Sequence, residues 1–100
     1  MNMQALMKQA QNMQRDINNI KNELDNTVFE GKSSLVTVEA MGNKTIKSIK
    51  ISEEAKEIVN DDISMLEDMI LVAMNDAFSK IDKTTEEKMG KYSNMMPGLM

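Results

Sequence analysis

The chain has no cysteine, histidine or tryptophan among its 100 residues, and only one proline and three aromatic residues. Without cysteine there are no disulfide bonds, thiolate metal sites or cysteine nucleophiles, and without histidine the commonest acid–base side chain is missing. The longest unbroken apolar run, residues 69–74, has six residues, whereas a membrane-spanning helix needs about 20. No apolar signal segment follows Met1. We therefore expect a soluble, cytoplasmic protein with no membrane partner.

Motifs typical of enzymes are also missing. The sequence contains no glycine-rich phosphate loop, no serine nucleophile elbow and no metal-ligand spacing. Half of its 16 acidic residues occur in four adjacent pairs, which are Glu53-Glu54, Asp61-Asp62, Glu67-Asp68 and Glu86-Glu87. Neighbouring positions on a helix point about 100° apart, so such pairs do not converge on one substrate atom. We expect solvated helix faces, and a protein that is not an enzyme and needs no metal or cofactor.

Methionine is abundant, with 12 residues, which fits either a loosely specified core or an adaptable surface for a partner. The net charge of −4 is unevenly distributed. Residues 1–50 carry seven basic and five acidic residues, whereas residues 51–100 carry five basic and eleven acidic ones. Because an acidic total argues mildly against nucleic-acid binding, a DNA-binding function requires a local basic face.

Residues 2–26 contain neither glycine nor proline, and their apolar residues recur in alternating steps of three and four. These residues are Met3, Leu6, Ala10, Met13, Ile17, Ile20 and Leu24. The spacing is that of positions a and d in a helix that packs along a seam. It predicts one long helix of roughly 36 Å, part of which protrudes or pairs with another chain.

β-branched residues then replace the helical period. We expect strands at residues 27–29, 35–41 and 45–51, joined by turns at residues 30–33 and 42–44, as a three-stranded antiparallel meander. Gly42 is available for a positive φ. Ile49 and Ile51 share a face that Ile46 does not, so we expect a bulge near Lys47-Ser48, or a second cover over Ile46.

Helical signals resume at Ser52. They predict a short helix over residues 52–59 and a long helix capped by Asn60, with a separate last turn opening at Thr84-x-x-Glu87. The fold class is therefore α+β, in the order α-β-β-β-α-α, with one domain over residues 1–91 and a mobile tail over residues 92–100. An open sheet edge and a broad apolar helix both need cover, which favours a homodimer.

The polar side of the first helix is rich in amides and bases. Lys8 and Arg15 share heptad position f and Lys21 lies beside them at e, whereas Gln4, Gln11 and Asn18 share b. These side-chain types bond phosphates and base edges, although an ordinary solvated face has the same composition. Lys44 and Lys50 form a second candidate DNA cluster, and Lys80 and Lys83 are reserve candidates.

The central spacing resembles a known family. It runs Val36-x-Val38-x-x-x-Gly42-x-x-x-Ile46-x-x-Ile49-x-Ile51, followed by Leu66-Glu67-Asp68, Ala73-Met74-Asn75-Asp76-Ala77 and Pro97-Gly98. This is similar to the YbaB/EbfC family of bacterial nucleoid-associated proteins. The resemblance implies a homodimer whose sheets join and whose helices project like the arms of a tweezer. It further implies low-specificity binding of double-stranded DNA in the nucleoid, with effects on nucleoid organisation and gene regulation.

The resemblance brings no catalytic or base-reading residue to this sequence. We expect Asn75 and Asp76 to cap or cross-link strands and helix at the dimer centre rather than to contact DNA. The predicted dimer and core residues are Val36, Val38, Ile49, Ile51, Leu66, Ile70, Ala73, Asn75 and Ala77. Two alternatives stay open, a protein–protein adaptor in DNA metabolism with little DNA affinity of its own, and a purely structural assembly module.

Overall fold

The computed structural model describes residues 2–93, without the side chains of residues 58, 59, 61 and 93. Its elements are α1 (Met3–Asp25), β1 (Val28–Ser33), β2 (Val36–Met41), β3 (Ile46–Ile51), α2 (Ala55–Asp61) and α3 (Ile63–Ser93). The predicted α+β order is confirmed. The predicted boundary at residue 92 falls inside α3, where Tyr92 is buried. Residues 94–100 of the predicted tail lie outside the described residues.

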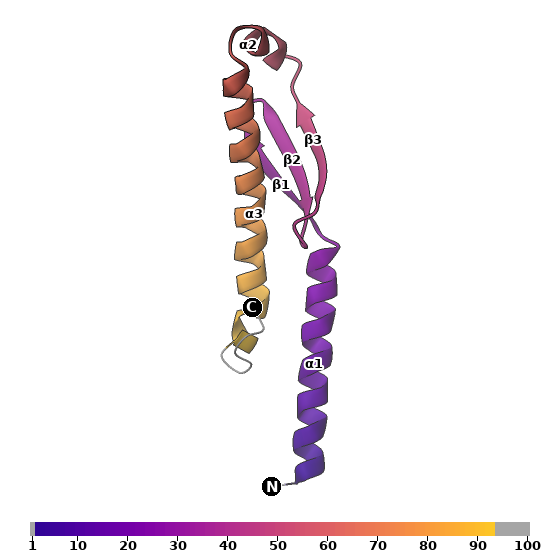
Figure 1. The fold of residues 1–100 in the computed structure, drawn as a ribbon. Helices are drawn as coiled ribbons and strands as arrows, with labels where there is room; N and C mark the ends of the chain where they lie inside the picture. Colours follow the sequence, from indigo (N-terminus) through magenta and orange to yellow (C-terminus); the bar gives the residue numbers. More distant parts are fainter. Residues whose placement is uncertain (1, 94–100) are drawn as a thin grey trace.

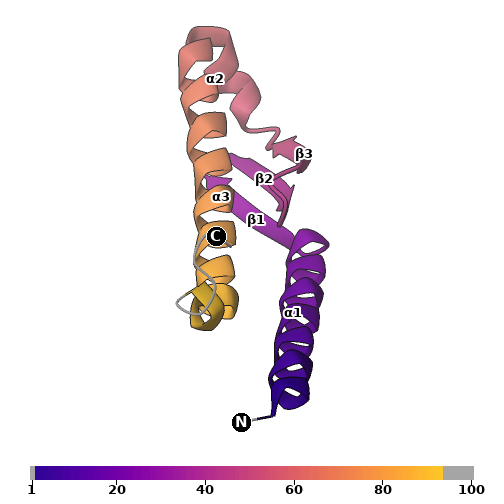
Figure 2. The same ribbon diagram turned by 60° about the horizontal axis from the view of Figure 1, so that its bottom comes forward.

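The molecule is elongated, with extents of 71 × 20 × 14 Å. Its radius of gyration is 19.5 Å, against about 13 Å for a compact chain of this length. The sheet lies against one side of α3, and α1 continues from the end of the sheet past the described end of α3 (Figures 1 and 2). The elongation arises because no other described element covers the first half of α1.

The boundaries of α1 follow from local hydrogen bonds. The side-chain oxygen of Asn2 accepts the N–H of Gln4 at 2.9 Å and begins the helix. At the other end, the side chains of Asn26 and Thr27 donate to carbonyls one turn back, at 2.8 and 2.6 Å. The helix predicted over residues 2–26 is thus confirmed.

Among the described residues, only the second half of the α1 seam is covered. Ile17 and Leu24 are buried in a small cluster with Met89 and Tyr92 of α3. Met3 at the other end is 73% exposed. The predicted protrusion of part of this helix is therefore present in the structure.

The sheet has the order β1-β2-β3 with antiparallel pairing throughout. Glu39 pairs with Ser48 and Ala40 with Ile46, so Lys47 is the extra residue of a bulge. This confirms the bulge predicted near Lys47-Ser48. It returns Ile46 to the side of the sheet that faces α3.

The first predicted turn was wrong, and the second lies at residues 42–44 as predicted. Residues 30–33 belong to β1, and the turn lies at Ser34 and Leu35, with Ser34 at φ 49°. In the second turn the positive φ of 67° belongs to Lys44 rather than to Gly42. Gly42 is needed for space instead, because a Cβ there would lie 1.7 Å from the carbonyl oxygen of Leu24.

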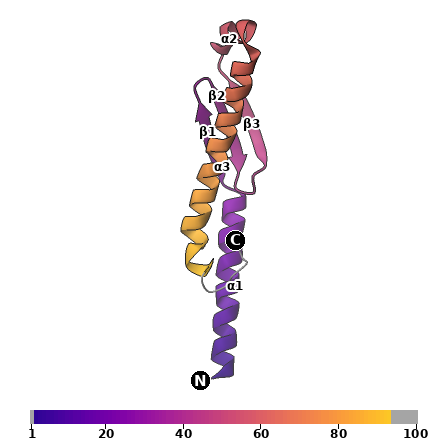
Figure 3. The same ribbon diagram turned by 60° about the vertical axis from the view of Figure 1, so that its left-hand side comes forward.

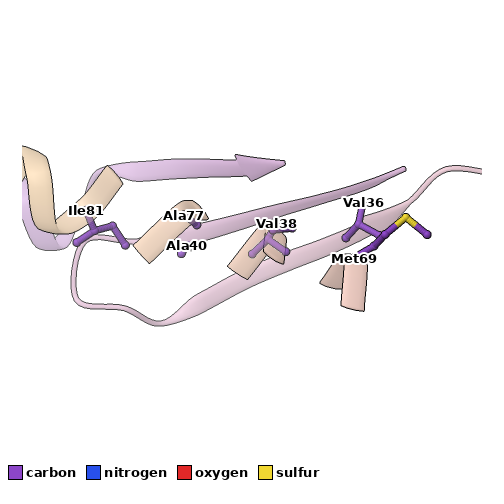
Figure 4. Close-up of a cluster of buried hydrophobic side chains, with 7 residues drawn as sticks. Val36, Val38, Ala40, Met69, Ala77 and Ile81 are labelled. Atoms are coloured by element: carbon purple, nitrogen blue, oxygen red, sulfur yellow. The ribbon is translucent and has the colours of Figure 1, made fainter. Parts of the chain in front are cut away.

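The main core lies between α3 and the first two strands (Figure 4). It consists of Val36, Val38 and Ala40 from β2 and Met69, Ala73, Ala77 and Ile81 from α3. Small residues let the helix approach closely. A Cβ added to Gly31 of β1 would lie 2.1 Å from the carbonyl oxygen of Ala73 and 2.8 Å from the Cβ of Ala77.

The start of α3 also differs from the prediction. Asp62, not Asn60, caps the helix, because its carboxylate accepts the N–H of Ser64 at 3.1 Å. The hydroxyl of Ser64 donates to the same carboxylate and is the main cause that lowers the pKa of Asp62. The helix then runs unbroken through Thr84 to Ser93, so the separate turn predicted there is wrong.

Gly31→Ala should destabilise the protein by about 2 kcal/mol or more, because the added methyl group meets the backbone of α3. The control is Gly90→Ala in the second half of α3, where an added Cβ has nothing within 4 Å among the described residues. That change should be neutral or stabilising by up to about 1 kcal/mol through helix propensity. Urea denaturation measures both. Equal effects of the two alanines would contradict the close contact.

Candidate nucleic-acid interface

The side of α1 opposite its seam carries the first group of predicted DNA contacts. Lys8, Arg15, Gln4 and Gln11 are all exposed there. The guanidinium of Arg15 donates to the side-chain oxygen of Asn12 at 3.0 Å, which holds the cation close to the helix surface. Lys8 and Arg15 are seven positions apart, or about 10 Å along the axis, a spacing that reaches more than one phosphate of a strand.

The other predicted α1 residues face a different environment. Asn18 and Lys21 line a cleft of about 770 Å³ between α1 and α3. The remaining lining includes three carboxylates, those of Asp25, Asp82 and Glu86. The structure therefore divides the predicted stripe into an outer part, with Lys8 and Arg15, and a part that shares an acidic cleft.

The second predicted cluster is divided too. The ammonium of Lys44 lies 2.9 Å from a carboxylate oxygen of Asp82 and 5.8 Å from the ring centroid of Phe78. Lys50 is exposed on β3, paired with Thr37 of β2. No local sequence pattern indicates the ion pair between Lys44 and Asp82, because the turn that carries Lys44 and helix α3 are far apart in the chain.

Glu39 lies on β2, the middle strand of the sheet, and its pKa is lowered by neighbouring residues of β3. The Ser48 hydroxyl donates to Glu39 at 2.6 Å and is the main cause that lowers the pKa of Glu39, with smaller contributions from the charges of Lys47 and Lys50.

Of the two reserve candidates, Lys83 is exposed on α3. Lys80 instead donates to the carbonyl oxygen of Glu30 at 2.8 Å.

Comparison with known proteins points to one family. The profile of the YbaB/EbfC DNA-binding family matches residues 1–96. The chain belongs to this family. A nucleoid-associated protein of Ligilactobacillus salivarius is 50% identical, with 99% of this chain and 95% of that protein covered. Another from Lactococcus lactis is 46% identical, with 97% and 98% covered.

One distant and one structural relative extend the comparison. A nucleoid-associated protein of Chloroflexus aurantiacus is 39% identical over 99% of both chains. The crystal structure of an uncharacterized protein from Helicobacter pylori is similar in fold, with a TM-score of 0.68 and 18% identity. It covers 96% of this chain, and 98% of that structure is matched. The YbaB/EbfC fold thus extends over the whole described chain.

Among the side chains that the structure describes, which exclude that of Asp61, no three acidic groups come together in a way that would hold a metal ion. No helix within residues 2–93 is long and apolar enough to cross a membrane.

Asp76 of α3 links helix and strand. Its carboxylate accepts the backbone N–H of Lys32 at 3.0 Å and pairs with the Lys80 ammonium at 3.2 Å. Since Lys80 also bonds the carbonyl of Glu30, these two side chains of α3 bind outward-facing backbone groups of β1. This is a strand–helix cross-link within one protomer. Its spacing, Asp76 four residues before Lys80, was visible in the sequence.

The predicted dimer and core residues fall into three environments. Val36, Val38, Ala73 and Ala77 are buried, and Leu66 and Ile70 are partly buried against them. Ile49 and Ile51 are 45% and 46% exposed, because α3 packs mainly on β1 and β2 and covers β3 chiefly at Ile46. Asn75 is exposed on α3, so it is not part of the protomer core. The assignment of Ile49, Ile51 and Asn75 to a dimer interface stays a prediction.

The bond from the Lys32 N–H is the main cause that lowers the pKa of Asp76 below its ordinary value, followed by Lys80. A carboxyl with a lowered pKa in the folded state stabilises the protein above its unfolded pKa and loses that contribution as the pH falls. Asp76→Asn should therefore be less stable than the wild type at pH 7, and the difference should shrink below about pH 4. Urea denaturation at pH 7 and pH 3 measures it. Asp68→Asn, an exposed carboxylate of the same helix, is the control, and a pH-independent difference for Asp76→Asn would contradict this role.

Proposed function

We propose that this protein binds double-stranded DNA as a homodimer with low sequence specificity, and thereby contributes to nucleoid organisation and gene regulation. The observation that carries the proposal is the outer side of α1, where Lys8 and Arg15 stand exposed among amides on a helix that extends past α3 (Figure 3). Membership of a DNA-binding family supports it. So do the names of the relatives, which are called nucleoid-associated proteins.

Binding through this surface would depend on phosphates. Lys, Arg, Gln and Asn on a straight helix bond phosphate oxygens, which positions a protein on a duplex without reading its sequence. A protein of net charge −4 is repelled by DNA overall, so two weak basic surfaces that act together favour binding more than one surface does. A twofold-symmetric dimer supplies the second copy.

The two edges of the sheet support a dimer that forms through β3. Backbone groups of the β1 edge are bonded by Asp76 and Lys80. β3 is the opposite edge, and in the described part of the chain no helix lies over it (Figures 1 and 3). Ile49 and Ile51 stand half-exposed on the α3 side of that strand. An open edge with apolar side chains favours pairing with another strand, and a second copy offers the same edge.

The double change Lys8→Gln and Arg15→Gln should weaken binding to a random duplex at least tenfold at low salt, by a similar factor on unrelated sequences. The slope of log K against log salt should flatten by about 0.9 for each phosphate that the variant no longer neutralises. Lys21→Gln should have a smaller effect, because Lys21 faces carboxylates in the cleft. Gel shifts or fluorescence anisotropy at two salt concentrations measure these changes.

The matched control is the double change Lys32→Gln and Lys56→Gln, which removes the same charge from β1 and α2. It should change affinity much less. Equal reductions in the two doubles would show that net charge alone matters and would remove α1 as the contact surface. A folded wild-type protein that does not bind duplex at low salt would favour the protein–protein adaptor instead.

The wild-type protein should sediment at low micromolar concentration with about twice the monomer mass of 11.3 kDa. Changing both Ile49 and Ile51 to Thr keeps β-branched side chains but removes apolar surface, and should raise the dimer dissociation constant at least tenfold. Val28→Thr, at an exposed position on β1, is the control and should leave the dimer intact. A monomeric wild type would refute the dimer, and an unchanged dimer in the double variant would move the interface away from β3.

A further inference from the structure

The turn between β2 and β3, residues 42–45, touches both long helices. On one side, the N–H of Gly42 donates to the carbonyl oxygen of Thr27 at 3.1 Å, directly after α1. The Gly42 backbone also lies so close to Leu24, in the last turn of α1, that a Cβ would be 1.7 Å from the Leu24 carbonyl oxygen. The end of α1 therefore packs directly on the backbone of this turn.

On its other side the turn holds α3. The ammonium of Lys44 pairs with Asp82 at 2.9 Å and lies over the ring of Phe78, one turn earlier on α3. Phe78 and Asp82 precede the part of α3 that packs on α1 through Met89 and Tyr92.

Three hydrogen bonds brace the turn itself. The N–H of Lys44 donates to the carbonyl oxygen of Met41 at 2.8 Å, and the N–H of Met41 donates to that of Thr45 at 2.8 Å. The side-chain oxygen of Asn43 accepts the N–H of Thr45 at 3.0 Å. A braced turn with one helix on each side transmits a displacement of either helix to the other.

We propose that the turn at residues 42–45 is a positioning element that sets the separation of α1 and α3, with Gly42 locating α1 and Lys44 holding α3. Its importance for DNA binding rests on the function proposed above, whereas its effect on helix separation does not. Lys44 then acts on DNA binding through α3 rather than as a phosphate contact. The cleft between the helices, lined by Gly42 and Asp82 among others, lies next to this element.

The separation is measured without DNA. The chain has no cysteine, so Asn19→Cys on α1 and Glu87→Cys on α3 give two unique spin-label sites, and dilution with unlabelled protein isolates the distance within one chain. Gly42→Ala should shift this distance, because a Cβ only 1.7 Å from the Leu24 carbonyl oxygen forces the turn and α1 apart. Lys44→Gln should broaden the distance distribution. Unchanged distributions in both variants would overturn the proposal, whatever happens to DNA binding.

The direction in which Asp82→Asn changes DNA affinity distinguishes a positioning role of Lys44 from a direct phosphate contact. Asp82→Asn removes a negative charge and frees the Lys44 ammonium. If Lys44 contacts phosphate, or if charge alone matters, affinity should rise. If the pair positions α3, affinity should fall about two- to fivefold, as expected for an exposed pair. Glu86→Gln, one turn further along the same cleft, is the matched control and should not lower affinity.

Charge reversal completes the test. Lys44→Asp alone should broaden the distance distribution and weaken DNA binding, and adding Asp82→Lys should restore both, since the pair re-forms with opposite polarity. Aspartate also accepts a positive φ more readily than lysine. Failure of the second change to restore the distance distribution would overturn the role of the pair. A restored distance without restored binding would instead refute the dependence of DNA binding on helix separation. Gly42→Ala is used only if its thermal unfolding stays cooperative, and the Lys44 and Asp82 variants test the proposal without it.

Discussion

The close contact between α3 and β1 at Gly31 is the constraint on which the rest of the structure depends. Because Gly31 has no side chain, the α3 backbone lies directly on the strand. At that distance Asp76 and Lys80 reach the outward-facing backbone groups of β1. A helix held further away would leave those groups to water or to another strand. One glycine thus decides that the β1 edge is closed by the chain itself and that β3 is the edge left open within the described residues.

The element order could be predicted because it depends on neighbouring residues. Three local signals were enough: the a/d spacing of α1, the β-branched residues of the strands, and the odd spacing between Ile46 and Ile49 that indicates a bulge. The turn at residues 30–33 was misassigned because glycine and serine are typical of turns. Gly31 is there for a helix that comes much later in the chain, and no local pattern contains that information. The capping residue of α3 was mispredicted for a different reason, because asparagine and aspartate are equally good N-caps and the sequence offers both, at Asn60 and Asp62.

The sequence predicted which side of α1 the candidate site residues occupy, but not which charged residues lie around them. Heptad position correctly separated Lys8 and Arg15 from the α1 seam. It did not indicate that Lys21 lines a cleft with carboxylates, or that Lys44 pairs with Asp82. The acidic second half of the chain and the basic first half meet in the fold, so part of the positive charge is compensated internally. The positive charges on the outer side of α1 are not compensated in this way.

The length of α1 has a consequence for what the helix can lie against. Its 23 residues give a rod of about 34 Å, close to the 34–36 Å of one turn of B-form duplex. Glycine and proline are absent from residues 2–26, so nothing in the sequence favours a kink. A straight rod of one duplex turn meets the same repeat of backbone positions at any site along the DNA. If α1 lies along DNA as proposed above, that geometry favours a footprint defined by helical pitch rather than by base sequence.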